Sequence, residues 1–325
     1  MSDGVLSEPQ HLARMFRPLS HTRLNPSSWN GNLLETLESV RHRSLTVLYN
    51  RGNRGDGLIH MGGRSLFASL GLKPREVHEE NAPLDFIRGD VLLVYGCGAF
   101  CRGSHTLAEA TQRIARNFKR IIILPASFDL ECGPVRRFVR SWDARYTVFC
   151  RELVSYDRLK RIETGARAIL LGHDLALHAD LSEWAARPHS GRAGIFRRDN
   201  EAAYGRLPQG IPNEDASHGT HREPEKLLDY VARFAEIHTD RCHGAISAAL
   251  MGRRVVFYRN SYFKNQAIYE HSLTQFPNVV FVRDQSFSFR QFFRANYWGR
   301  VRPLEMKIRA GLGQRPAHFP QPSVQ

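Results

Sequence analysis

The feature that most constrains this chain is an alternation of short apolar runs with segments of helical periodicity. SLTVLYN at 44–50, DVLLVYG at 90–96 and KRIIILPAS at 119–127 are largely apolar, and segments with helical spacing at 58–72 and 106–118 separate them. Strands that are apolar on both faces are typical of parallel sheets covered by helices on both sides. The sequence therefore predicts an α/β fold.

A second set of the same kind follows the first, beginning with RAILLGHD at 167–174 and ending with NVVFVRD at 278–284. We therefore predict two Rossmann-like domains that face a central cleft. The expected divisions are an irregular N-terminal arm at 1–30, a first domain at 31–165, a second, donor-binding domain at 166–285 and a basic aromatic tail at 286–325.

The tail at 286–325 interleaves Arg and Lys with Phe, Tyr and Trp, and holds seven basic residues against one acid, Glu305. Two interpretations are open. The tail binds an anionic membrane surface as a peripheral contact, or it forms a helix that packs its aromatic side chains on the first domain.

The formal net charge of +14 calls for an anionic partner, such as nucleic acid, a membrane face or a phosphorylated substrate. The basic residues are spread along the chain and do not form a single run, which argues against a nucleic-acid-binding arm. We expect no nucleic-acid partner.

The five cysteines form neither a disulfide framework nor the paired spacing of a zinc site, so we expect no metal and a reducing, cytoplasmic environment. No stretch approaches the roughly 18 apolar residues of a transmembrane helix. We expect a cytoplasmic protein that is soluble or peripheral at the inner membrane face.

The stretch IHTDRCHGAISAALMGRRVVFYRNSYFK at 237–264 concentrates positive charge at one strand end. It places Arg241 and His243 at the start of a small-residue helix, and Lys264 just after the next strand. The planar guanidinium of Arg can donate two parallel hydrogen bonds to a carboxylate or phosphate. His exchanges a proton near neutral pH, and a helix N-terminus attracts anions. This combination favours a site for a small anion.

Two glycine-rich loops also follow predicted strands. RGNRGDGLIH at 51–60 contains Asp56, which either contributes to a site or only caps the next helix. GCGAFCRGSH at 96–105 contains Arg102 and His105, and it is either a ligand loop or a surface connection. Neither matches a dinucleotide or phosphate-loop fingerprint.

Further arginines follow two other predicted strands. Arg151 stands in CRELVSYDRL, and it either binds a ligand or pairs with a neighbouring carboxylate as scaffold. The adjacent Arg197 and Arg198 have the same alternatives. Because the carboxyl ends of parallel strands meet at one edge, these side chains are expected to share one cleft.

The chain resembles the polysaccharide pyruvyl transferases from about 45 to 264. The resemblance rests on the order of several landmarks, which are GNRGD at 52–56, CRELVSYDRL at 150–159, HDLAL at 173–177, FRRDNE at 196–201, TDRCHGAISAALMG at 239–252, Tyr262 and Lys264. It implies a fold like that of the B-type glycosyltransferases. It also implies transfer of a pyruvyl group from phosphoenolpyruvate to a sugar as a ketal, with no cofactor.

The resemblance also implies roles for individual residues. Arg151, Arg241 and Lys264 would hold the carboxylate and phosphate of the donor, and His243 would be the general acid. The remaining expected members of the site are Asp56 as the candidate base, with Asn53 and Arg198 as substrate-binding residues.

The acceptor is expected to be a glycan or lipid-linked oligosaccharide of exopolysaccharide biosynthesis. One alternative is a glycosyltransferase of the same architecture that uses a nucleotide sugar, although the second domain has no clear acidic pair for a ribose. A less favoured alternative is a non-catalytic binder of anionic polymers, suggested by the net charge.

Overall fold

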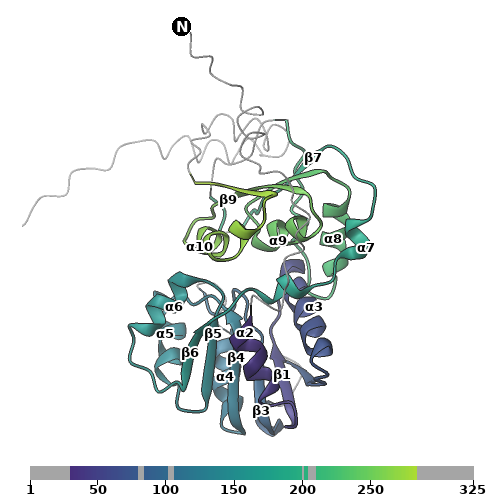
Figure 1. The fold of residues 1–325 in the computed structure, drawn as a ribbon. Helices are drawn as coiled ribbons and strands as arrows, with labels where there is room; N and C mark the ends of the chain where they lie inside the picture. The colour runs from purple at the N-terminus through teal and green to yellow at the C-terminus, as the bar shows by residue number, and fades with distance from the viewer. Residues whose placement is uncertain (1–29, 80–83, 102–105, 200, 204–209, 284–325) are drawn as a thin grey trace, which may run out of the picture. The chain divides into compact units, whose positions relative to one another are not determined.

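The computed structural model describes residues 30–79, 84–101, 106–199, 201–203 and 210–283 of the 325-residue chain (Figure 1). The predictions for the N-terminal arm, the basic tail, Arg102 and His105 lie outside these described residues, except for Asn30. The described parts of both sheets fall in one compact unit. Among the described residues, no helix combines the length and apolarity that crossing a bilayer requires.

The first sheet has six parallel strands in the order β2-β1-β3-β4-β5-β6. Most of the side chains of the four central strands are buried, as expected for a sheet covered on both faces. The strands are β1 (Leu45–Tyr49), β2 (Arg75–His78), β3 (Gly89–Val94), β4 (Phe118–Ala126), β5 (Tyr146–Cys150) and β6 (Ala168–Leu171).

Helices accompany these strands in the first half of the chain (Figure 1). They are α2 (Gly31–Glu38), α3 (Arg54–Ser69), η2 (Leu84–Phe86), α4 (Thr106–Ala115), α5 (Gly133–Arg140), α6 (Leu153–Lys160) and η3 (Leu175–His178), where η denotes a 3₁₀ helix.

The second sheet has four parallel strands in the order β10-β9-β8-β7, so each strand pairs with its neighbour in sequence. Its elements are β7 (Arg192–Ile195), α8 (Pro224–Ala232), β8 (Glu236–Thr239), α9 (Cys242–Leu250), β9 (Arg254–Tyr258), α10 (Lys264–His271), η4 (Leu273–Gln275) and β10 (Val279–Val282), preceded by α7 (Ser182–Ala185). Two parallel sheets alternating with helices confirm the predicted α/β fold.

Two strands differ from the prediction. The run at 168–171 was expected to begin the second set, but it pairs with β5 and forms an edge of the first sheet. Its four residues are all half-buried, as an edge strand requires, and α6 is the crossover that returns the chain beside β5. Strand β2 was not predicted, because REVH lacks an apolar run and lies at the opposite edge.

Helix α3 begins at Arg54, earlier than its apolar periodicity indicates, because Asn53 and Asp56 form a capping box. The Asn53 side chain accepts hydrogen bonds from the amides of Gly55 at 2.8 Å and Asp56 at 3.3 Å. In return, Asp56 Oδ2 accepts the Asn53 amide at 2.9 Å. The cap fixes the first turn of α3 directly after β1.

Helix α3 packs against η3 as well as against α8 and α9 of the second sheet. At Gly62 the helix approaches η3 so closely that a Cβ atom would lie 1.8 Å from the Leu175 carbonyl oxygen. Only glycine allows this approach. The contact fixes the segment after β6 beside α3, close to the N-terminus of α9.

Candidate active site

A cavity of about 220 Å³ lies where loops following strands of both sheets meet. This is smaller than the roughly 300–1,000 Å³ of pockets for drug-sized ligands, as expected for a small substrate. The cavity is lined by Asn50, Arg51, Gly52, Asn53, Asp56, Cys97, Gly98, Ala99, Arg151, Arg197, Glu201, Ser217, Arg241, Cys242, His243 and Lys264.

Arg241, at the N-cap of α9, is held by two carboxylates. Its Nε and Nη2 donate to Asp215 at 3.0 and 2.6 Å, and its Nη1 lies 2.9 Å from Oδ2 of Asp199. Burial acts to lower the pKa of Arg241, but Asp215 and then Asp199 hold that pKa above its ordinary value. The guanidinium therefore stays charged although its side chain is only 8% exposed.

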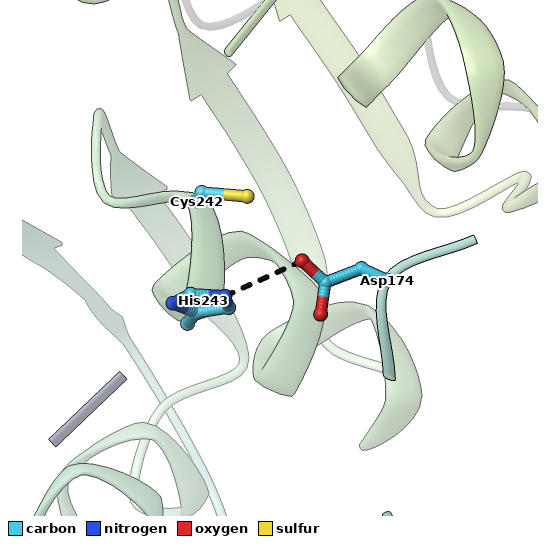
Figure 2. Close-up of side chains that lie close together, drawn as sticks. All are labelled: Asp174, Cys242 and His243. Atoms are coloured by element: carbon cyan, nitrogen blue, oxygen red, sulfur yellow. Dashed lines mark ion pairs between the residues drawn. The ribbon is translucent and has the colours of Figure 1, made fainter. Parts of the chain in front are cut away.

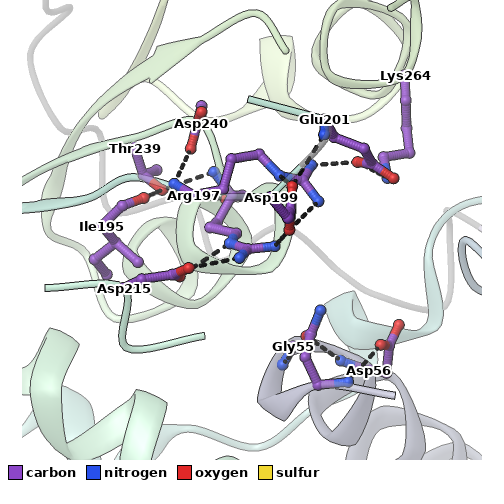
Figure 3. A network of polar contacts seen from close by, with 12 residues as sticks. Gly55, Asp56, Ile195, Arg197, Asp199, Glu201, Asp215, Thr239, Asp240 and Lys264 are labelled. Carbon is purple, nitrogen blue, oxygen red and sulfur yellow. Dashed lines mark hydrogen bonds and ion pairs between the residues drawn. The ribbon is translucent and has the colours of Figure 1, made fainter. Parts of the chain in front are cut away.

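Glu201 is the common partner of several donors in the same cavity (Figure 3). Its Oε2 lies 2.9 Å from Lys264 Nζ and also accepts from Arg197 Nη1, while its Oε1 accepts from the Tyr262 hydroxyl at 3.1 Å. Burial acts to raise the pKa of Glu201, but Lys264 and Arg197 bring it down to about 2. Glu201 thus carries its charge at neutral pH, at a point where several donors converge.

A third group joins Arg151, Asp174 and His243, and Figure 2 shows Asp174 and His243 of this group. Arg151 Nη1 lies 2.7 Å from Asp174 Oδ2, and both side chains are 1% exposed. The same carboxylate oxygen lies 3.5 Å from His243 Nε2. Burial acts to raise the pKa of Asp174, but Arg151 and then His243 hold that pKa below its ordinary value.

His243 lies in the first turn of α9, against the first turn of α3. A Cβ atom at Gly55 would lie 2.8 Å from His243 Nδ1 and 2.9 Å from both His243 Cβ and Asn53 Oδ1. Side chains at such distances must move, and here the neighbours are a helix cap and the imidazole. The glycine of the first loop therefore makes room for the histidine of the second sheet.

We expect Gly55→Ala to lower turnover by about 10-fold or more, because the added methyl displaces the His243 ring and misplacement by an ångström can cost about 100-fold. Steady-state kinetics on the purified variant measures the effect. Gly71→Ala is the folding control, since Gly71 has a positive φ of 66° outside the site and its substitution strains the backbone without touching His243. Full activity in Gly55→Ala would contradict the tight fit.

Most of the predicted site residues come together in the cavity. Arg151, Arg241, His243 and Lys264 all line it, and so do Asn53 and Asp56. Asn53 and Asp56 also carry out the capping that was the alternative interpretation of Asp56.

Arg198 differs from these residues, because its side chain is exposed and it is not among the lining residues. Its neighbour Arg197 lines the cavity, where its guanidinium pairs with Asp199 and Glu201.

The acidic partners were not assigned roles from the sequence. Asp174 stands in the HDLAL landmark and Asp199 and Glu201 in FRRDNE, so the landmarks contained them. These acidic partners can be predicted from charge balance. A buried cation needs a nearby negative charge, so the predicted basic residues imply carboxylates close to them. Asp215, in the long polar segment before α8, had no local signal.

The oxygen, sulfur and nitrogen atoms of Asp174, Cys242 and His243 lie within 4.8 Å of one another (Figure 2). This is a spacing that could hold a metal ion. However, Arg151 already neutralises Asp174, and burial raises the pKa of the Cys242 thiol to about 12. A cation would have to compete with a guanidinium and deprotonate a buried thiol, so these residues fit a resident metal poorly.

Comparisons with known proteins bear on both fold and family. The crystal structure of an uncharacterized protein from Klebsiella pneumoniae subsp. pneumoniae NTUH-K2044 matches with a TM-score of 0.65 at 24% identity, covering 80% of this chain and 100% of that one. At this identity the likeness shows the fold alone. No curated protein matches the chain. The family model of the polysaccharide pyruvyl transferases matches residues 53–262, well over half of the chain. The chain belongs to the polysaccharide pyruvyl transferase family.

Proposed function

We propose that this protein transfers a pyruvyl group from phosphoenolpyruvate to a sugar of a cell-surface glycan precursor and forms a ketal. The observation that carries the proposal is a small cavity in which Arg197, Arg241, Lys264 and His243 converge from successive strand ends. The two sheets would then be the halves of a fold like that of the B-type glycosyltransferases, with the reaction between them.

The donor would bind by replacing acidic side chains. Asp199 and Glu201 are 45% and 24% exposed, so they can leave their cationic partners. The carboxylate and phosphate of phosphoenolpyruvate offer the same oxygens to Arg241, Arg197 and Lys264. The donor therefore binds to Arg241, Arg197 and Lys264, which are already charged and oriented in the free protein.

The chemistry needs an acid and a base. Protonated His243 gives its proton to the methylene carbon, the π pair of the double bond forms the new C–H bond, and a sugar hydroxyl attacks the cationic carbon that results. A second hydroxyl then displaces phosphate, which leaves toward the same cations. Asp56 lines the cavity and is our candidate to receive a hydroxyl proton.

We further propose that the acceptor is a glycan or lipid-linked oligosaccharide of exopolysaccharide biosynthesis, met in the cytoplasm or at the inner membrane face. The five cysteines are all free thiols, which is consistent with a reducing compartment.

The direct test is phosphate release from phosphoenolpyruvate in the presence of candidate acceptor sugars, with ketal formation followed by mass spectrometry. A thermal-shift comparison with nucleotide sugars separates the alternative, because only the true donor stabilises the fold substantially. We expect stabilisation by phosphoenolpyruvate. Stabilisation by a nucleotide sugar alone would instead identify a glycosyltransferase.

We expect Glu201→Gln to lower the KM for phosphoenolpyruvate by about tenfold with little change in kcat, because the donor no longer competes with a charged internal carboxylate. Initial-rate kinetics over a range of donor concentrations measures both constants. Glu214→Gln changes an exposed carboxyl before α8 and is the control for net charge. A fall in kcat with unchanged KM would show that Glu201 acts in the chemistry.

A further inference from the structure

We infer that Asp174 is a positioning residue for His243. Arg151 then holds the Asp174 carboxylate in place and does not bind the donor. The inference rests on the proposed function, in which His243 is the general acid. It reassigns a residue that the family resemblance placed among the donor ligands, and it gives a role to a carboxylate that the sequence left without one.

Both oxygens of Asp174 are held in place. Oδ1 accepts the amide of Ala176 at 2.9 Å, which caps η3, and Oδ2 accepts from Arg151 Nη1 at 2.7 Å. Arg151 is fixed in turn, since its Nε donates to Ser127 Oγ at 2.9 Å and its amide to the Ala126 carbonyl at 3.0 Å. The carboxylate therefore has one orientation, and it presents Oδ2 to His243.

Burial separates this ion pair from those made by Asp199 and Glu201. Arg241 has one buried partner, Asp215, which is 8% exposed, but its other partner Asp199 is 45% exposed and the Lys264 partner Glu201 is 24% exposed. Asp174 is 1% exposed and is the N-cap residue of η3, which packs on α3. A donor anion could replace an exposed partner, but displacing Asp174 from Arg151 would leave a buried carboxylate without compensation.

The arrangement determines which nitrogen of His243 can give the proton. Nε2 is buried, has no hydrogen-bond partner within the described part of the chain, and lies 3.5 Å from Asp174 Oδ2. Catalytic hydrogen bonds are often this long before substrate binds. Figure 2 shows the second ring nitrogen on the side away from Asp174, and Nδ1 is the atom that lies near Gly55.

The proposed proton transfer starts from the doubly protonated ring of His243. The imidazolium carries a proton on each nitrogen, and the Nδ1–H bond breaks with its electron pair left on Nδ1. The proton forms a C–H bond with the π pair of the donor's double bond. The neutral ring that remains carries its hydrogen on Nε2, where it faces the Asp174 carboxylate, so Asp174 selects the tautomer that the reaction produces.

Asp174→Asn tests the inference by kinetics. We expect kcat to fall by about 10- to 1,000-fold with the KM for phosphoenolpyruvate nearly unchanged, and the alkaline limb of the pH–rate profile to move to lower pH. Asp174→Glu, which keeps the charge, should restore part of the rate. Glu152→Gln is the matched control, because Glu152 is a fully buried carboxyl that accepts hydrogen bonds from the amide and hydroxyl of Ser155. An unchanged kcat and pH profile in folded Asp174→Asn would overturn the inference.

Removing one member of a buried ion pair can unfold a protein, so a second variant is needed. Arg151→Gln/Asp174→Asn removes both charges and keeps groups that can hydrogen-bond. We expect it to fold, as checked by circular dichroism, and to show the low kcat and the near-normal KM of the single variant. A large rise in the KM for phosphoenolpyruvate would return Arg151 to the donor site and overturn the reassignment.

A measurement without turnover separates this inference from the proposed function. Nitrogen-15 NMR of the wild-type histidines, with the His243 signal identified by its loss in His243→Gln, should show hydrogen on Nε2 at alkaline pH. Hydrogen on Nδ1 would overturn the inference. If wild type released no phosphate from phosphoenolpyruvate, the proposed function would fail, while the NMR result would still decide whether Asp174 holds His243.

Discussion

Replacing His243 with glutamine should lower kcat by about 10²- to 10⁴-fold, which is the usual contribution of a general acid to the rate. Binding of the donor should be nearly unchanged. The reason is geometric. His243 lies at the start of α9, between Asp174 and the first turn of α3, and lines the same cavity as Arg241 and Lys264. Glutamine keeps a polar side chain but cannot deliver a proton to carbon.

Phosphate release measures the rate, and thermal shift with phosphoenolpyruvate measures binding in the same preparation. His218→Gln is the control, because His218 is exposed and is not among the lining residues. Arg241→Ala should instead raise the KM for the donor. If His243→Ala and Arg241→Ala both turned over at the wild-type rate, the roles assigned here would be excluded.

The free energy of unfolding should fall as the pH decreases from about 7 to about 4. Burial lowers the pKa of His60 to about 3 and that of His178 to about 4. Burial, followed by the neighbouring His271, lowers the pKa of His173 to about 4. A histidine with a depressed folded pKa contributes stability above the unfolded value near 6.5, and this contribution is lost as the pH falls toward the folded pKa.

The expected change in the free energy of unfolding is large compared with the total stability of a folded domain. Between pH 6.5 and 4, His60 and His178 each remove roughly 3 kcal/mol, against a typical total of about 5–15 kcal/mol. Asp240 acts in the opposite direction, because burial raises its pKa to about 7. Between pH 6.5 and 4, protonation of Asp240 adds roughly 3 kcal/mol to the free energy of unfolding. The histidines with lowered pKa values together remove more unfolding free energy than Asp240 adds, so the net change is a loss of stability.

Urea unfolding at a series of pH values measures this dependence. His60→Phe should flatten it, because it removes the buried imidazole with the lowest pKa, whereas Asp240→Asn should steepen it by removing the opposing group. His218→Phe, at an exposed position, should leave the slope unchanged. A stability that rises toward pH 4 in the wild type would contradict the assignment of buried neutral histidines.

Much of the fold followed from local patterns. Apolar runs such as 44–50 and 119–127 have few polar residues, so they can only be strands buried on both faces or helices, and their length decides for strands. The placement of Arg241, His243 and Lys264 at strand ends was also visible in the sequence, because strand ends precede helix starts in any parallel α/β chain.

The sequence by itself determined the α/β fold class and placed Arg241, His243 and Lys264 after the ends of predicted strands. The tertiary structure decided which residues contact one another in the site. Arg151 forms an ion pair with Asp174, Lys264 forms one with Glu201, and Gly55 packs closely against His243. It also decided that the strand at 168–171 closes the first sheet. The physical reason is that periodicity reports which face of an element is buried, whereas the contacts between distant elements depend on strand order and helix packing, which no local pattern encodes.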